Sequence, residues 1–197
     1  HHQFALQDAS GLGTGKGKEP APEALQSFAR DAMRNGADVV FFHGPGHLRG
    51  VEIIDGKPAF YGLGNFIRNP YVQNVVPMET YRDPGFALDS AKEAIDPSDT
   101  SITENEVATQ VMPPHPREYF ETIVARLEFS NQGLKRIFLH PIDLKFDAPI
   151  SDIGIPQIAT GALAQKILQR IQNDNALYGT EMRIEGDVGV IEVGDAT

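Results

Sequence analysis

The stretch GADVVFFHGPGHLRGVEIIDGKPAFYGLGNF, residues 36–66, decides how the rest of the chain is interpreted. Residues 38–42 (DVVFF) are an apolar, β-branched and aromatic run with the length of a buried strand. His43 and His47 follow at once, on a turn rich in glycine and proline. Open α/β sheets bind ligands at the carboxyl ends of their strands. The stretch therefore predicts a strand that brings two histidines to a ligand-binding edge.

A β-hairpin is predicted directly after this turn. Residues 51–54 and 58–61 flank an Asp-Gly pair, which is a strong signal for a two-residue hairpin turn. Two glycines then precede Asn65, in a loop that requires unusual backbone angles or a close approach of another segment. Asn65 is therefore a candidate substrate-binding residue beside the two histidines.

The residues of the turn are compatible with a metal site. Neutral imidazole is the commonest metal ligand in proteins, and two histidines on a rigid turn can converge on one ion. The surrounding glycines leave room for an ion and for an anionic substrate. The alternative is that one histidine stabilises the loop and the other faces water, because a short motif is only a hypothesis about function.

The same stretch resembles the CapA family of bacterial capsule or poly-γ-glutamate synthesis proteins. The resemblance follows the order GAD, a hydrophobic strand, HGP, LRGVEI, GKP and FYGLGNFI over residues 36–67. It implies a calcineurin-like metallophosphoesterase fold, which is an α/β architecture with a layered β-sandwich flanked by helices (α-β-β-α). More diffuse similarity continues toward the C-terminal end of the chain.

Departures from the family pattern affect the candidate ligands. The glycine before the first family histidine is Phe42 here, and the second family histidine is replaced by Gly46, with His47 one place later. The resemblance implies that His43 is a metal ligand. His47 would be a replacement ligand or a general acid. Arg49 would bind substrate anions with two nitrogens of its guanidinium group.

The resemblance also concerns the first residues of the chain. His1 and His2 fall about where the family carries a histidine before the GAD block, so either could be a further metal ligand; the alternative is a purification tag. The family's GD and Asn-His motifs do not occur in this sequence. We therefore expect residues 1–197 to be the C-terminal part of a CapA-like domain that binds divalent ions of the Mn, Fe, Zn or Mg type.

Composition excludes several classes of protein. The 197 residues are 41% hydrophobic and 22% charged, which is ordinary for one globular domain. A formal net charge of −10 argues against a nucleic-acid-binding protein, which needs basic patches. The absence of cysteine excludes disulfides and thiolate ligands within this sequence. No apolar run reaches the roughly 18 residues of a membrane span.

The rest of the chain predicts ordinary structural elements around one irregular stretch. Residues 69–117 are rich in proline and have no sustained period, so they form either a surface excursion or a lid beside the site. Lys166 and Arg170 lie near the end of a predicted helix and suit its dipole. The other predicted elements are a helix over 22–35, a strand pair over 120–129 and 134–139, a helix over 157–172, and a strand pair over 182–184 and 188–193.

The resemblance implies a function in the cell envelope or outside the cytoplasm. We expect a metal-dependent hydrolase or phosphoesterase that acts in the synthesis or release of an anionic capsule polymer of the poly-γ-glutamate type. Its partners would be that polymer or a phosphorylated substrate, and other capsule-synthesis subunits. Two alternatives remain open: a non-catalytic scaffold or polymer-binding subunit that keeps the fold, and a phosphodiesterase unrelated to capsule.

Overall fold

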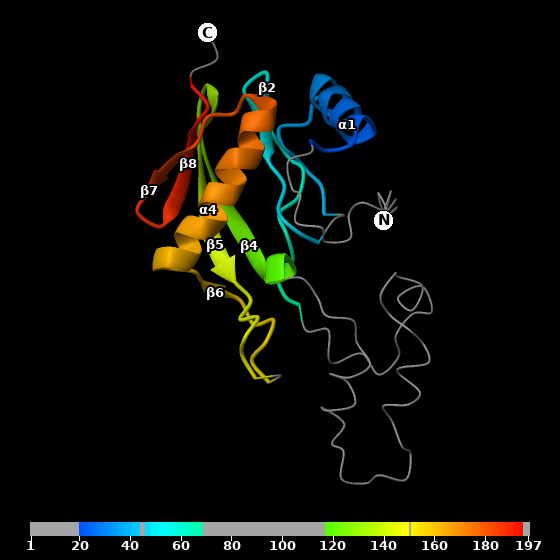
Figure 1. The fold of residues 1–197 in the computed structure, drawn as a ribbon. Coiled ribbons are helices and arrows are strands. Elements are labelled where there is room, and N and C mark those ends of the chain that lie inside the picture. Colours follow the sequence, from blue (N-terminus) through cyan, green and yellow to red (C-terminus); the bar gives the residue numbers. More distant parts are fainter. Residues whose placement is uncertain (1–19, 44–45, 69–116, 150, 195–197) are drawn as a thin grey trace, which may run out of the picture.

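The computed structural model describes residues 20–43, 46–68, 117–149 and 151–194 (Figure 1). His1, His2 and nearly all of the irregular stretch predicted at 69–117 lie outside these residues. The described part is a mixed α/β structure with two β-sheets and two α-helices. The predicted α/β class is thus confirmed at this level.

The first sheet is built from the stretch that carries the two histidines. Helix α1 (Glu23–Arg34) leads into strand β1 (Val40–Phe41), and β2 (Val51–Ile54) and β3 (Lys57–Phe60) form the predicted hairpin. The strand order is β1-β3-β2, with β1 parallel to β3 and β2 antiparallel to it. Asp55 and Gly56 both have positive φ angles, 49° and 74°, as a type I′ hairpin turn requires.

The second sheet contains most of the remaining chain. Its path is β4-β5-β8-β7, and β6 pairs with the far end of β5. Short 3-10 helices, η4 (Arg117–Phe120) and η5 (Ala176–Tyr178), precede β4 and follow helix α4. The bounds are β4 (Glu121–Ser130), β5 (Gly133–Asp143), β6 (Gln157–Ile158), α4 (Gly161–Asn175), β7 (Arg183–Glu185) and β8 (Val188–Glu192).

Helix α4 joins the two sheets through one apolar core. In Figure 1, α4 runs along one face of the five-stranded sheet. Its buried side chains Ala164, Ile167, Leu168 and Ile171 recur at helical spacing. They belong to the same core cluster as Val51 of the first sheet and Ile137 and Leu139 of the second, which are all fully buried.

The predicted bounds of two elements were wrong: the strand expected over residues 38–42 is only Val40–Phe41, and the second helix is displaced along the chain. The sequence pattern predicted a helix over 157–172, but α4 begins at Gly161 and ends at Asn175. Gln157 and Ile158 instead pair with Asp143 and Ile142 of β5. The reason is that a backbone ladder with a distant strand overrides the local apolar pattern. Among the described residues, no helix is both long and apolar enough to cross a membrane.

Candidate functional site

The structure places His43 at the carboxyl end of a strand, as the sequence predicted. β1 ends at Phe41, and the backbone N–H of Phe42 still donates a hydrogen bond to the carbonyl of Phe60, at 2.8 Å. His43 comes next and is exposed to solvent. Because β1 and β3 are parallel, this edge corresponds to the ligand-binding edge of an open α/β sheet.

Asn65 connects the far side of the turn to a distant segment. Its side-chain amide nitrogen donates to the carbonyl of Gly46 at 2.8 Å and to the carbonyl of Tyr119 at 3.1 Å. Gly46 has a φ of +68°, in the left-handed region that favours glycine. The amide nitrogen of Asn65 therefore has a structural use in holding the turn against η4, beside any contact with substrate.

His47 packs against the same distant segment. Its ring lies edge-to-face with the ring of Tyr119, with centroids 5.9 Å apart and an interplanar angle of 77°. His47 is half-buried, whereas His43 is exposed. The two histidines of the turn thus have different environments, which their spacing in the sequence did not indicate.

Arg49 interacts with the end of α4. Burial raises the pKa of the Asp174 carboxyl to about 6, and the positive charges of Arg170 and Arg49 oppose that rise. The backbone N–H of Arg49 also donates to the carbonyl of Gly62 at 3.0 Å. The carboxyl of Asp174 is therefore a nearby acidic group of the protein itself that would compete with a substrate anion for the positive charge of Arg49.

The tyrosine of the FYGLGNF block supports the turn from the interior. Tyr61 is fully buried, and its hydroxyl donates a hydrogen bond of 2.5 Å to the carboxylate of Glu52. Burial, followed by this hydrogen bond, raises the pKa of Tyr61. Its ring stacks on Phe42 at 5.6 Å and on Tyr178 at 4.9 Å. Tyr61 thus fixes the residue that immediately precedes His43.

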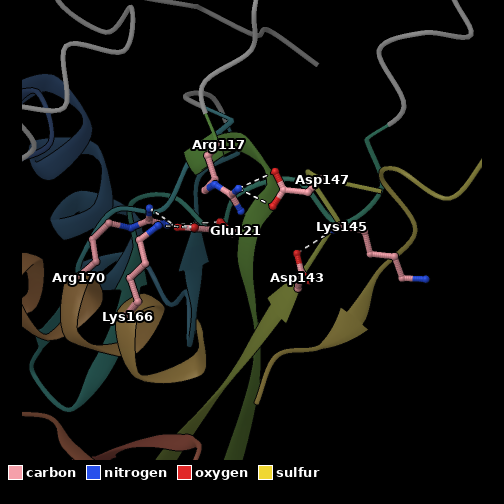
Figure 2. Close-up of polar contacts among 7 residues, drawn as sticks. All are labelled: Arg117, Glu121, Asp143, Lys145, Asp147, Lys166 and Arg170. Carbon is pink, nitrogen blue, oxygen red and sulfur yellow. Dashed lines mark hydrogen bonds and ion pairs between the residues drawn. The ribbon is translucent and has the colours of Figure 1, made fainter. Parts of the chain in front are cut away.

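A buried carboxylate was missed by the sequence analysis. Glu121, at the start of β4, is 2% exposed and accepts from Lys166 at 2.7 Å and from Arg170 at 2.9 Å. Figure 2 shows both cations reaching toward it from α4. The prediction that Lys166 and Arg170 suit the helix dipole was wrong, because α4 continues to Asn175 and its last turn has no basic residue; both side chains pair with Glu121 instead. Their spacing of four residues, which places both side chains on one face of a helix, was the sequence signal that they could share one partner.

A second ion pair lies nearby but is exposed. Arg117 donates two hydrogen bonds to Asp147, at 2.7 and 2.5 Å, and its guanidinium lies 4.7 Å from the centroid of the Phe146 ring (Figure 2). Asp143 accepts from the backbone N–H of Lys145 at 2.7 Å. The Arg117–Asp147 pair and the bond from the backbone of Lys145 to Asp143 thus connect η4 to the residues around the end of β5.

The described residues alone do not form a complete metal site. Within the described ranges, no group of three or more histidine, aspartate or glutamate side chains could hold a metal ion. His43 is the candidate ligand that the structure leaves exposed at the strand edge.

A pocket of about 550 Å³ lies away from these residues. Its walls come from the end of α4, from η5 and from the β7–β8 hairpin, and include Gln172, Met182 and Arg183. None of the residues that the sequence analysis selected lines it. The pocket is therefore separate from the turn that carries His43 and His47.

The chain is similar to bacterial capsule synthesis proteins. The family described as "Bacterial capsule synthesis protein PGA_cap" matches residues 11–70, which include the turn and the first sheet. The resemblance predicted from residues 36–67 is thus confirmed. Two proteins of Sinorhizobium fredii (strain NBRC 101917 / NGR234), the uncharacterized proteins y4sH and y4uA, are each 31% identical over 183 residues. That alignment covers 89% of this chain, and the chain spans 38% of the length of either relative.

Proposed function

We propose that this chain is part of a capsule synthesis protein that acts as a metal-dependent hydrolase on an anionic substrate. The substrate would be a capsule polymer of the poly-γ-glutamate type or a phosphorylated compound used to make or release it. The family match over residues 11–70 supports the connection with capsule synthesis, because it contains the whole His43–His47 turn. The hydrolytic activity is the further step of the proposal.

One observation carries the proposal. His43 is exposed directly beyond β1, at the carboxyl end of a strand that is parallel to its neighbour. The stacked rings of Phe42 and Tyr61 hold the residue that precedes it. A fixed histidine at such an edge is suited to bind a divalent ion. An ion held there would offer positive charge to a phosphate or carboxylate group.

The proposed fold is the layered metallophosphoesterase-like sandwich. In support, β1 and β3 form a parallel pair beside an antiparallel sheet, α1 precedes the first sheet in the chain, and α4 lies between β6 and β7 of the second. The shared core of α4 and the two sheets keeps the His43 edge in a fixed relation to β4. A metal ligand at that edge would then have a defined position.

The experiment is a metal analysis of the full-length protein and two variants. Wild type should retain bound Mn, Fe or Zn after dialysis, and His43→Ala should lose at least one ion per molecule. His140→Ala is the matched control, because His140 is half-buried within β5 and outside the turn. It should keep the wild-type metal content. Equal metal content in wild type and His43→Ala would refute the role of His43.

A non-catalytic scaffold is the second candidate function. It is favoured by Gly46, which stands where the family pattern has a second histidine. The two functions differ in turnover. Metal-loaded full-length protein that hydrolyses bis(p-nitrophenyl) phosphate, with loss of turnover in His43→Ala, supports the hydrolase. Polymer binding without turnover supports the scaffold.

A further inference from the structure

Tyr119 contacts three parts of the candidate site from a distant place in the sequence. It belongs to η4, just before β4. Its ring packs edge-to-face with His47, and the guanidinium of Arg68 lies 5.0 Å from the ring centroid. Its backbone carbonyl accepts from the side-chain amide of Asn65. None of the sequence patterns assigned Tyr119 a role.

The ring of Tyr119 also fills the space beside Gly46. A Cβ atom added at Gly46 would lie 2.9 Å from Cε1 of Tyr119 and 3.1 Å from its Cδ1. The positive φ of Gly46 adds a second obstacle to any side chain at this position. A histidine directly after the proline, as in the family pattern, therefore does not fit this turn. The histidine that the turn can present here is His47.

Arg68 brings a positive charge to the same ring. Its guanidinium also lies 5.9 Å from the centroid of Phe120, and its backbone N–H donates to the carbonyl of Gly154 at 3.3 Å. Burial lowers the pKa of Arg68, but an arginine remains protonated at neutral pH. An imidazole and a guanidinium thus both lie within 6 Å of one aromatic ring.

We propose that Tyr119 is a positioning residue that holds His47 and Arg68 in one arrangement, in which they bind the anionic group of the substrate. The inference rests on the proposed function and adds the part of the site that recognises the anion. Edge-to-face packing restrains the imidazole, and a cation–π contact restrains the guanidinium. Guanidinium and imidazole N–H groups are suitable donors to phosphate or carboxylate oxygens.

Three variants of the full-length, metal-loaded protein test this role, with inorganic phosphate as the probe. Tyr119→Leu removes the ring and should weaken phosphate binding about tenfold. Tyr119→Phe keeps the ring, and its phosphate affinity should stay within about twofold of the wild-type value. Arg68→Gln keeps the ring but removes the charge, and it should also weaken binding about tenfold. Metal content should be unchanged in all three.

A spectroscopic measurement separates positioning from general stability. The imidazole C–H resonance of His47, assigned with His47→Gln in histidine-labelled protein, should shift in Tyr119→Leu and remain near the wild-type position in Tyr119→Phe and Arg68→Gln. Phe138→Leu is the matched control, since it removes a ring that Arg126 covers at 3.8 Å on β5, far along the chain from the turn. It should change neither the resonance nor phosphate affinity.

The outcomes are distinguishable. A Tyr119→Leu protein with wild-type His47 resonance and wild-type phosphate affinity overturns the proposal, and so does a Tyr119→Phe protein as defective as Tyr119→Leu. If Tyr119→Leu does not fold, wild-type phosphate affinity in Arg68→Gln overturns the proposal. Wild-type protein that binds metal but not phosphate overturns this inference and leaves the metal site standing. Wild-type protein without metal overturns the proposed function, while the His47 resonance still decides whether Tyr119 positions the histidine.

Discussion

The turn after β1 and the β4–β5 hairpin are built in opposite ways. In the hairpin, the two paired strands are consecutive in the chain. Its turn is open, because a Cβ added at Gly133 would meet nothing within 4 Å. Around the turn, the partners come from distant segments. A Cβ at Gly50 would lie 2.6 Å from the carbonyl oxygen of Asp174, and one at Gly64 would lie 2.8 Å from the hydroxyl of Thr122.

The candidate site is therefore a junction between distant segments of the chain and not a local motif. The buried side-chain oxygen of Asn175 accepts from the backbone N–H of Val51 at 2.7 Å, and Asn65 binds the carbonyl of Tyr119. The end of α4 and the start of β4 thus hold the loops that carry the candidate residues. Substitutions at the junction should cost more stability than comparable substitutions in the hairpins.

The largest expected effect is at Glu121, where β4 meets α4. Glu121→Ala should lower the free energy of unfolding by about 3 kcal/mol or more, because it leaves the partly buried guanidinium of Arg170 without its carboxylate. Urea denaturation of the full-length protein measures this change. Asp147→Ala is the control, since Asp147 is 71% exposed in its pair with Arg117 and should cost less than about 1 kcal/mol. If both variants lose the same free energy of unfolding, the buried Glu121 pairs do not stabilise the protein more than the exposed Arg117–Asp147 pair does.

Gly50 gives the next largest effect. Gly50→Ala should destabilise the protein by about 2–3 kcal/mol, because the added methyl group meets the backbone of Asp174, which cannot rotate away. Gly186→Ala, in the β7–β8 turn, has a φ of +58° but open space around its Cβ, so it should cost only about 1 kcal/mol. Thermal unfolding of both variants compares them directly. A smaller loss for Gly50→Ala would show that the junction can relax.

Asn65 tests the hydrogen bonds of the junction. Asn65→Ala removes both donors to the carbonyls of Gly46 and Tyr119 and should cost about 1–2 kcal/mol. Because the loop then loses its connection to η4, amide hydrogen exchange around Gly46 should become faster. Gln169→Ala is the control, because Gln169 forms its hydrogen bonds on the exposed face of α4. Unchanged exchange in Asn65→Ala would mean that the ring of Tyr119 alone holds the turn.

The smallest expected effect is a pH dependence at Asp174. Burial raises the pKa of this carboxyl in the folded state to about 6, above its ordinary value of 3.8. The folded state therefore favours the protonated form, so the contribution to stability is complete below pH 4 and is lost as pH rises to about 6. Asp174→Asn should remove this part of the pH dependence in urea denaturation. If the free energy of unfolding of wild type, relative to Asp174→Asn, rises between pH 4 and 6, the predicted direction is wrong.

Local patterns predicted much of the fold but little of the junction. The β2–β3 hairpin follows from its Asp-Gly pair, and His43 follows directly from a short apolar run, so both could be predicted from neighbouring residues. The start of α4 was misplaced because Gln157 and Ile158 pair with β5. Lys166 and Arg170 were assigned to a helix dipole because Glu121 lies in a different segment of the chain.

The order of the residues was enough to predict the α/β class of the fold, the turn with its two histidines and the resemblance to capsule synthesis proteins. These features depend on backbone preferences and residue order over a few neighbouring positions. The exposure of His43, the packing of His47 on Tyr119 and the burial of Glu121 beside two cations became visible in the folded structure alone. The physical reason is that burial and contact between distant segments depend on how helices and sheets pack, and a local pattern does not record which segments will meet.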